Sequence, residues 1–397
     1  MAQKQIGAIL LVAGTSIGSG MIALPMVLAK LGIIPSVIVM LVVWASSYKC
    51  SLASLELNLQ SKKGLPLPAL GRKFSGRKAE AIGAISLKTL LYSLLAVYIY
   101  GLASIAQKLA DFYWRADVSA LSPATYIAFG TAAILLLPIK WIDYVNRIAF
   151  AGLLAIFLML LCGIVASVDS SRLPLFISAS PSCVYSVLSV AFTSFGFHVI
   201  FHTLANYCEL DAKTLKKAFF YGSLIPAAVY IAWTYGVLGV LYGANETFYA
   251  QMSAGQKDVG DLIKELSSIS SLPNVRLLVW LLSISAILTS ILGVGAALAD
   301  SLDFMLKDKI TSKFVRKTTC SALAVAPSYV AAIAIPNAFI KIFGFAGAIL
   351  SIIAIFMPIY LFYKANIKRL YYKELSKKWL TALILLFGIL VALSEII

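Results

Sequence analysis

The first apolar segment of the chain is interrupted near its middle by three glycines, Gly14, Gly18 and Gly20. The segment runs from about residue 6 to residue 31, which is long enough to cross a bilayer as a helix. Glycine weakens a helix, and unpaired backbone inside hydrocarbon is tolerated only where it lines a cavity or is buried in protein. The pattern therefore predicts a broken membrane helix that makes room for a polar solute. A helix kink or a small-residue packing face explains the same glycines equally well.

Composition places the chain among polytopic membrane proteins. It is 61% hydrophobic and 13% charged, whereas a soluble domain has about 25% charged residues. We expect an all-α integral membrane protein with eleven transmembrane helices and no soluble domain. The expected spans are 6–31, 33–58, 81–109, 121–139, 147–168, 184–207, 218–242, 276–302, 318–335, 338–363 and 379–395.

The net charge of +16 is distributed as topology requires, and this argues against nucleic acid as a partner. Basic residues crowd the segments expected on one side, whereas the opposite connections hold only Arg115, Arg172, Lys257 and Lys264. The positive-inside rule then predicts a cytoplasmic N-terminus and, with an odd number of spans, a periplasmic C-terminus. The basic excess is expected to contact anionic membrane lipid. Nothing indicates an obligate protein partner.

Cysteine and histidine usage predicts neither a disulfide nor a metal cluster. No CxxC pair occurs among the five cysteines. The two histidines, His198 and His202, lie four residues apart on one expected helix, but no third ligand is evident. His198 is either a satisfied interior histidine or a group that carries a proton or contacts substrate. We expect no cofactor.

A second interruption occurs where an inverted repeat would require it. The LeuT-type arrangement has two five-helix halves of opposite topology, each opening with a broken helix. The sixth expected span carries Gly196 among aromatics and hydroxyls, in the run Phe192-Thr193-Ser194-Phe195-Gly196-Phe197-His198. We therefore expect a 5+5 repeat with broken helices 1 and 6, its halves at 1–168 and 184–363, followed by a last helix at 379–395.

These motifs resemble the hydroxy and aromatic amino acid permease family of the amino acid–polyamine–organocation superfamily. The resemblance rests on residues 12–21 with Leu24-Pro25, on residues 193–198, and on Thr289-Ser290-x-Leu292-Gly293-Val294. Trp44, Glu56, Tyr92, Tyr98 and the run Asp143-x-x-Asn146-Arg147 are further matches. The resemblance implies a proton-motive importer of aromatic amino acids, tyrosine first among them, in the bacterial inner membrane.

The resemblance also implies a binding site. Backbone amides around Gly18, Ser19 and Gly20 would take the substrate carboxylate, and carbonyls near Phe195 and Gly196 would take its amino group. Substrate-binding residues are then expected among Gly14, Thr15, Ser16, Gly18, Ser19, Gly20, Phe195, Gly196, Phe197, His198, Tyr92 and Tyr98. The aromatic members would stack on the ring of the substrate.

The chain departs from the family pattern at two places, one that affects the shape of the second half of helix 6 and one that bears on the coupling ion. Val199-Ile200 stands where a Gly and a Pro usually follow the helix-6 histidine, and Leu153 lies where a helix-5 lysine is usual. A buried lysine is a natural proton carrier, so without it His198 and Lys88 are the candidates for proton coupling.

Sodium is the alternative coupling ion. The carbonyls of Gly14, Ile17 and Ala286 with the hydroxyls of Thr289 and Ser290 would form a cage of hard oxygens for one sodium ion. The same hydroxyls can instead bond back to their own helix.

The function expected from these features is ion-coupled uptake of an aromatic amino acid by alternating access. A transporter of serine, threonine or another small amino acid is the nearest alternative. A polytopic enzyme would need a nucleophile–base pair, a metal cluster or a carboxylate dyad, and a channel would need a pore ring. The sequence contains none of these, so we expect no enzyme.

Overall fold

The computed structural model describes residues 2–115, 121–178, 180–269, 273–335, 338–367 and 369–395, and these residues form helices and no strand. The helices are α1 (Ala2–Ser16), α2 (Gly20–Leu28), α3 (Ile33–Ser61), α4 (Leu67–Ser75), α5 (Arg77–Trp114), α6 (Leu121–Leu135), α7 (Ile139–Ala166), α8 (Pro181–Tyr185), α9 (Leu188–Ser194), η1 (Phe197–Ile200), α10 (Phe201–Tyr207), α11 (Ala212–Ala244), α12 (Glu246–Ser253), α13 (Val259–Ile269), α14 (Pro273–Leu306), α15 (Lys313–Ala334), α16 (Ala338–Ser351), η2 (Ile352–Phe356), α17 (Met357–Lys364), η3 (Lys373–Ser376) and α18 (Lys378–Leu393). The prediction of an all-helical membrane protein is confirmed.

Within the described residues, seven helical segments are long and apolar enough to cross a membrane, and the bent pair α1–α2 raises the number to eight. The segments 122–135 and 378–393 are apolar but shorter. Helix α15 begins with basic residues and is less apolar. All eleven predicted spans coincide with helical segments, but length and composition qualify only seven or eight. The eleven-span count and the inverted repeat therefore stay predictions.

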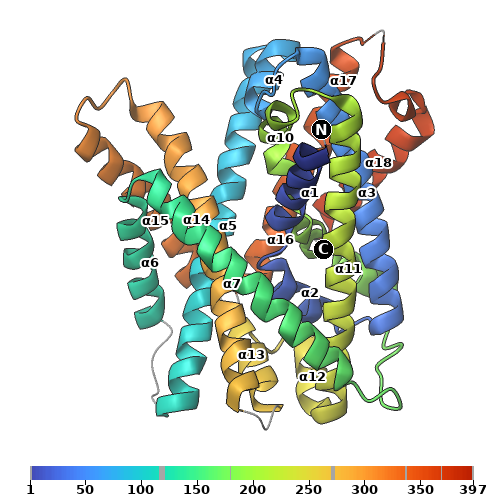
Figure 1. Ribbon diagram of the computed structural model, residues 1–397, viewed down its shortest axis with the longest axis vertical. Helices are drawn as coiled ribbons and strands as arrows, with labels where there is room; N and C mark the ends of the chain where they lie inside the picture. The colour runs from blue at the N-terminus through green and yellow to red at the C-terminus, as the bar shows by residue number, and fades with distance from the viewer. Residues whose placement is uncertain are drawn as a thin grey trace.

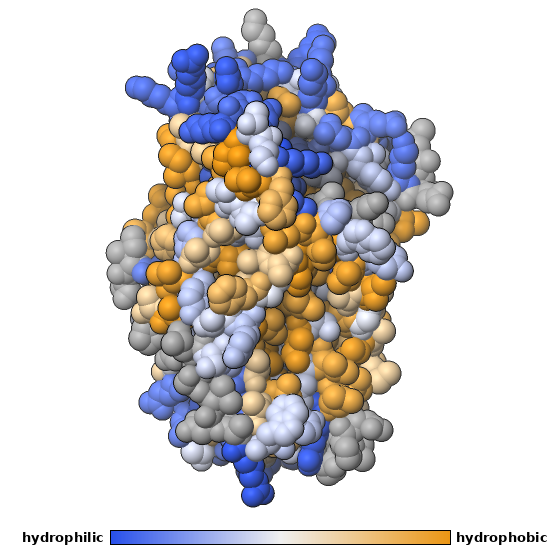
Figure 2. All heavy atoms as spheres, turned by 90° about the vertical axis from the view of Figure 1, so that its left-hand side faces the viewer, coloured by the Kyte–Doolittle hydropathy of each residue, from blue (hydrophilic) through white to orange (hydrophobic). Residues whose placement is uncertain are grey.

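The helices form an elongated bundle in which α1, α3 and α11 stand side by side and α7 crosses the bundle at an angle (Figure 1). Helix α4 and the start of α1 lie at one end, and α12 and α13 lie at the other (Figure 1). We call these the α4 end and the α13 end. Figure 2 shows a band of apolar side chains between hydrophilic ends, as a membrane-spanning protein requires.

Three connections refine the sequence analysis. The connection after α11 contains two helices, α12 and α13, which lie outside the predicted spans. A helix that we did not predict, α4, follows α3. Gly32 turns the chain between α2 and α3 with a φ of 82°, and a Cβ there would lie 2.7 Å from the carbonyl oxygen of Pro174. This close approach explains why glycine occupies the turn.

Candidate functional site

Both predicted helix breaks are present. Helix α1 ends at Ser16 and α2 begins at Gly20, with a bend of 53° between them. Helix α9 ends at Ser194, and after Phe195 and Gly196 the chain continues as the 3-10 helix η1. Two segments far apart in the sequence thus interrupt their helices in the interior of the bundle, where most of their side chains are buried.

The first break leaves backbone donors free at the start of α2. Among the described residues no backbone acceptor bonds the amides of Gly18 or Ser19. The first N–H groups of any helix lack partners within the helix and carry its positive dipole end. A carboxylate is the natural ligand for such a group of donors. These free amides are compatible with the predicted role of Gly18, Ser19 and Gly20, which stays a prediction.

The two breaks touch at Gly20. A Cβ built on Gly20 would lie 2.8 Å from Cβ of Ser194 and 2.9 Å from the hydroxyl of Tyr230. Real Cβ atoms essentially never approach other atoms this closely. Glycine at position 20 is therefore what allows the start of α2 to lie against the end of α9.

Tyr230 joins the two breaks and was missed by the sequence analysis. Its buried phenol on α11 donates to the carbonyl oxygens of Ser16, at 2.5 Å, and Ser194, at 3.0 Å. These carbonyls belong to the last residues of α1 and α9, where helix carbonyls lack helical partners. On the same helix, the indole N–H of Trp233 donates to the carbonyl of Met21 at 2.8 Å. Helix α11 is therefore the scaffold on which both breaks are held.

Of the two predicted tyrosines, only Tyr98 reaches the first break. Tyr98 is buried on α5 and faces the hydroxyls of Ser19 and Ser290. The hydroxyl of Ser290 also lies against Gly18, 3.1 Å from where a Cβ would stand. Tyr92 instead donates to the carbonyl of Leu323 on α15, at 3.0 Å.

The remaining helix-1 candidates point in different directions. Thr15 is exposed and donates to the carbonyl of Leu11 in its own helix, at 2.7 Å. Gly14 lies against the ring of Phe150 on α7. Ser16 is buried and contributes its carbonyl to Tyr230, while its hydroxyl donates to Val12. The structure brings Ser16 to the junction of the breaks and leaves Thr15 outside it.

The aromatic residues of the second break are packed within the protein. Phe197 is fully buried and stacks on His198, with ring centroids 4.4 Å apart. Phe195 is also fully buried and meets the ring of Tyr230 edge-on. His198 Nε2 lies 3.2 Å from the Ser47 carbonyl of α3. The stacking of Phe197 on a substrate ring stays a prediction. It would require Phe197 to move away from His198, on which it stacks here.

The coupling candidates are separated in space. The hydroxyls of Thr289 and Ser290 both donate to the carbonyl of Ala286, at 3.2 and 2.9 Å. Ser290 lies beside Gly18 at the first break, and the sodium cage stays a prediction. The ammonium of Lys88 contacts the sulfur of Met305. Lys88 lies ten residues before Tyr98 on α5, about 15 Å along the helix, and thus far from the break. The side chains of Asp143 and Arg147 lie outside the described residues.

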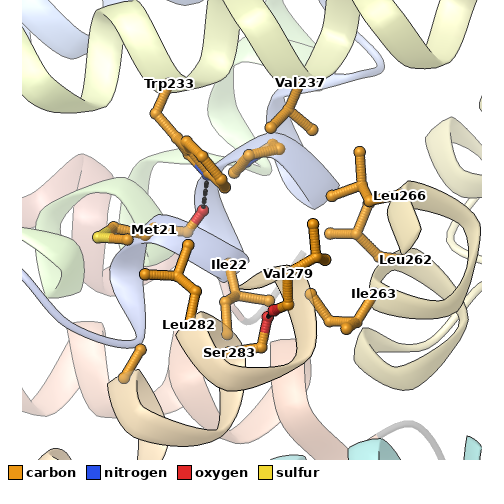
Figure 3. Close-up of a pocket in the computed structure, with 12 residues that line it drawn as sticks. Met21, Ile22, Trp233, Val237, Leu262, Ile263, Leu266, Val279, Leu282 and Ser283 are labelled. Atoms are coloured by element: carbon orange, nitrogen blue, oxygen red, sulfur yellow. Dashed lines mark hydrogen bonds between the residues drawn. The ribbon is translucent and has the colours of Figure 1, made fainter. Parts of the chain in front are cut away.

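A narrow apolar cavity lies beside α2, toward the α13 end. It is lined by residues of α2, α11, α13 and α14. Figure 3 shows Met21, Ile22 and Trp233 on one side and Leu262, Ile263 and Leu266 of α13 on another. The centre of a water molecule can reach only about 10 Å³ of it, roughly the room for one water. This cavity is therefore too small to hold an amino acid.

Comparison with known proteins places the chain in context. The model of the tryptophan/tyrosine permease family matches residues 1–395. The tyrosine-specific transport system 1 of Haemophilus influenzae is 28% identical, over 98% of this chain and 95% of that protein. The tryptophan-specific transport protein of Pseudomonas aeruginosa is 27% identical, over 99% and 94%. Glutamine transporter 2 of Aliivibrio fischeri is 25% identical, over 99% of each.

Proposed function

The chain belongs to the tryptophan/tyrosine permease family, and from this premise we propose that it imports an aromatic amino acid, tyrosine first among them. It is a multi-pass protein of the bacterial inner membrane and a transporter rather than an enzyme. Relatives named for tyrosine and for tryptophan match nearly its full length. The observation that carries the proposal is the junction of two broken helices at Gly20 and Ser194, because transporters hold polar solutes at such junctions.

In this proposal the substrate binds across the junction. Its carboxylate accepts from the amides of Gly18, Ser19 and Gly20, and its ammonium donates to carbonyls at the end of α9. Tyr98 and Ser290 add hydroxyls beside Gly18, and the aromatic ring extends toward Phe195 and Phe197. Because α2 lies directly against the end of α9 at Gly20, binding across the junction requires α2 or α9 to move.

The proposed architecture is the eleven-helix LeuT-type fold. Helices α1–α7 form the first half, α8–α17 form the second half with the outer hairpin α12–α13, and α18 is the last span. The N-terminus lies in the cytoplasm and the C-terminus in the periplasm, so the α13 end faces the periplasm. The basic residues of the connections at the α4 end support this orientation.

A proton is the proposed coupling ion, with one sodium ion as the alternative. The family resemblance supports the proton. The position of Ser290 beside Gly18 supports sodium, because it brings a hydroxyl of α14 to the first break.

Uptake of radiolabelled tyrosine into proteoliposomes tests the substrate. We expect uptake that excess tyrosine or tryptophan abolishes and that serine leaves unchanged. Competition by glutamine is included because one relative is named for that amino acid. Uptake blocked by glutamine or serine, but not by tryptophan, would place the chain with transporters of small polar amino acids.

A further inference from the structure

A polar ladder fastens α13 to α5 at the α13 end of the molecule. The side chains of Tyr100, Ser104, Lys108 and Asp111 recur at helical spacing along α5, and each contacts a residue of the connection before α13 or of α13 itself. Lys108 pairs with Asp261 at 2.8 Å, and Lys264 pairs with Asp111 at 2.6 Å. Both pairs are partly exposed, so each contributes little on its own.

Asp258 occupies the inner end of this ladder. Its Oδ2 accepts from the hydroxyls of Tyr100, at 2.8 Å, and Ser104, at 2.9 Å. Its Oδ1 accepts from the amide of Val259. The nearest charged groups are Asp261 on α13, whose carboxylate repels it, and Lys108 on α5, which is already paired with Asp261. Asp258 is thus a half-buried carboxylate with neutral donors and no cation of its own among the described residues.

Helix α13 packs closely against α5 beside Asp258. The amide of Gly260 donates to the Ser104 hydroxyl at 3.1 Å, and a Cβ on Gly260 would lie 2.5 Å from the Ser104 carbonyl. The opposite face of α13 presents Leu262, Ile263 and Leu266 to the cavity beside α2 (Figure 3). Helix α12 in turn holds the end of α2, because the Tyr249 hydroxyl donates to the Ala29 carbonyl at 2.8 Å. The hairpin therefore links α5 to the outer half of the first broken helix.

We propose that Asp258 is a proton-binding site that controls the docking of α13 on α5, so that proton uptake accompanies closure of the α13 end. The proposal deepens the proposed function, on which its role in transport rests. On protonation, Oδ2 gains the proton and donates it to one of the two hydroxyls, which rotates to accept. When α13 leaves α5, water replaces these hydroxyls and the proton is released.

The direction of the effect follows from burial. Burial raises the pKa of Asp258 in the docked state, and the three hydrogen bonds offset this only in part. A group whose pKa is higher when docked binds a proton on docking, so low pH favours the docked state. Docking weakens as pH rises from the ordinary aspartate range through the raised pKa, and above it the loss is complete.

Hydrogen–deuterium exchange of the protein in lipid nanodiscs tests the proposal without any substrate. The readout is the exchange of amides 259–269, corrected for the intrinsic dependence on pH, with α4 as an internal reference at the opposite end. We expect protection in the wild type to rise on acidification, by up to about tenfold for each unit by which docking raises the pKa. Asp258→Asn, which mimics the protonated acid, is expected to be protected at every pH.

Three variants keep the outcome decisive. Asp261→Asn breaks the partly exposed pair with Lys108 and removes the repulsion of Asp258, so it should lower protection and move the transition to lower pH. Gly260→Val should undock α13 at every pH and so calibrates the readout. If Asp258→Asn does not fold, Tyr100→Phe removes one donor to the carboxylate and should move the transition to higher pH. A wild-type response retained in Asp258→Asn, or protection that falls on acidification, would overturn the proposal even if tyrosine uptake is observed.

Discussion

At the residue scale, Gly20 is the position where a single methyl group has the largest consequence for the site. The start of α2 touches the end of α9 there, and the phenol of Tyr230 lies on the same spot. A side chain at position 20 must separate the two breaks or displace Tyr230. Glycine is thus required by packing between two helices as well as by access of a ligand to bare backbone.

We therefore expect Gly20→Val to abolish tyrosine binding while the protein still inserts and remains monodisperse. The valine side chain would fill the space of the carboxylate and collide with Ser194 and Tyr230. Thermal stabilisation by tyrosine and size-exclusion chromatography measure the two properties. Gly152→Val is the matched control, because nothing lies within 4 Å of a Cβ at that glycine of α7. Wild-type affinity in well-folded Gly20→Val would refute the location of the site.

Tyr230 carries the second residue-scale prediction. Removing its hydroxyl in Tyr230→Phe leaves the buried carbonyls of Ser16 and Ser194 without their shared donor. An unsatisfied buried polar group costs about 1–3 kcal/mol, so we expect a clear fall in thermal stability together with weaker tyrosine binding. Tyr126→Phe, at a largely exposed ring on α6, should change neither. A stability unchanged from wild type would mean that water replaces the phenol.

At the element scale, the breaks themselves were predictable and their surroundings were not. Closely spaced glycines weaken a helix wherever the helix lies, so Gly14, Gly18 and Gly20 indicate the first break from local physics alone. Tyr230 carries no such signal, because an aromatic residue in an apolar segment resembles any packing residue. Its role exists only because α11 docks against both breaks.

Helical phase explains which candidates were misjudged. Thr15 and Ser16 are adjacent in sequence, but neighbouring residues on a helix point about 100° apart, so only Ser16 faces the junction. Tyr92 and Tyr98 lie six residues apart on α5 and contact different helices, α15 and α14. Which face of a helix meets the site depends on packing between helices, and a single sequence does not report it.

Another element, the connection from α17 to α18, is held by a buried carboxylate. Glu56 of α3 is fully buried and accepts from the amides of Tyr371 and Tyr372, at 3.2 and 3.0 Å, and from the amide group of Gln60 at 2.7 Å. The Tyr372 hydroxyl extends this anchor to the Ala212 carbonyl at the start of α11. Glu56 is one of the family matches, and its burial and anchoring role were not predicted from the sequence.

We expect Glu56→Gln to destabilise the protein by about 1.5–3 kcal/mol, the contribution of hydrogen bonds to a charged group. Glutamine keeps one acceptor oxygen but turns an N–H group toward a backbone N–H. Thermal unfolding measures the loss, and limited proteolysis should then cut near residues 369–376. Glu80→Gln removes a partly exposed partner of Arg72, 3.4 Å away, and should cost no more than about 0.5 kcal/mol. Equal effects of the two variants would exclude the anchoring role.

At the scale of the whole molecule, both broken helices are attached to helices that remain continuous. Tyr230 of α11 bonds the last residues of α1 and α9, Ser16 and Ser194. The α12–α13 hairpin joins the C-terminal end of α2 to α5. An opening of the α13 end must therefore release contacts at the hairpin or at α11. We expect a coupling ion, if one drives transport as proposed, to act on one of these contacts or on the breaks themselves.

The coupling ion is the last prediction, and it separates two arrangements of the same residues. If a proton drives uptake, the hydroxyls of Thr289 and Ser290 only brace α14 against the first break, as their bonds to Ala286 suggest. If sodium drives uptake, these hydroxyls turn toward the carbonyls of Gly14 and Ile17 and hold the ion there. We expect the first case, with tyrosine uptake driven by an inward pH gradient in the absence of sodium.

Uptake is measured in proteoliposomes with a pH gradient alone and with a sodium gradient at equal pH, each repeated for Ser290→Ala and His198→Ala. Proton-driven uptake that persists in Ser290→Ala but is lost in folded His198→Ala identifies the histidine as the carrier. If proton-driven uptake persists in both variants, Lys88 and Asp258 become the candidate proton carriers. Sodium-driven uptake that is lost in Ser290→Ala would contradict the expectation, because only a sodium ion bound by the Ser290 hydroxyl makes uptake depend on that hydroxyl.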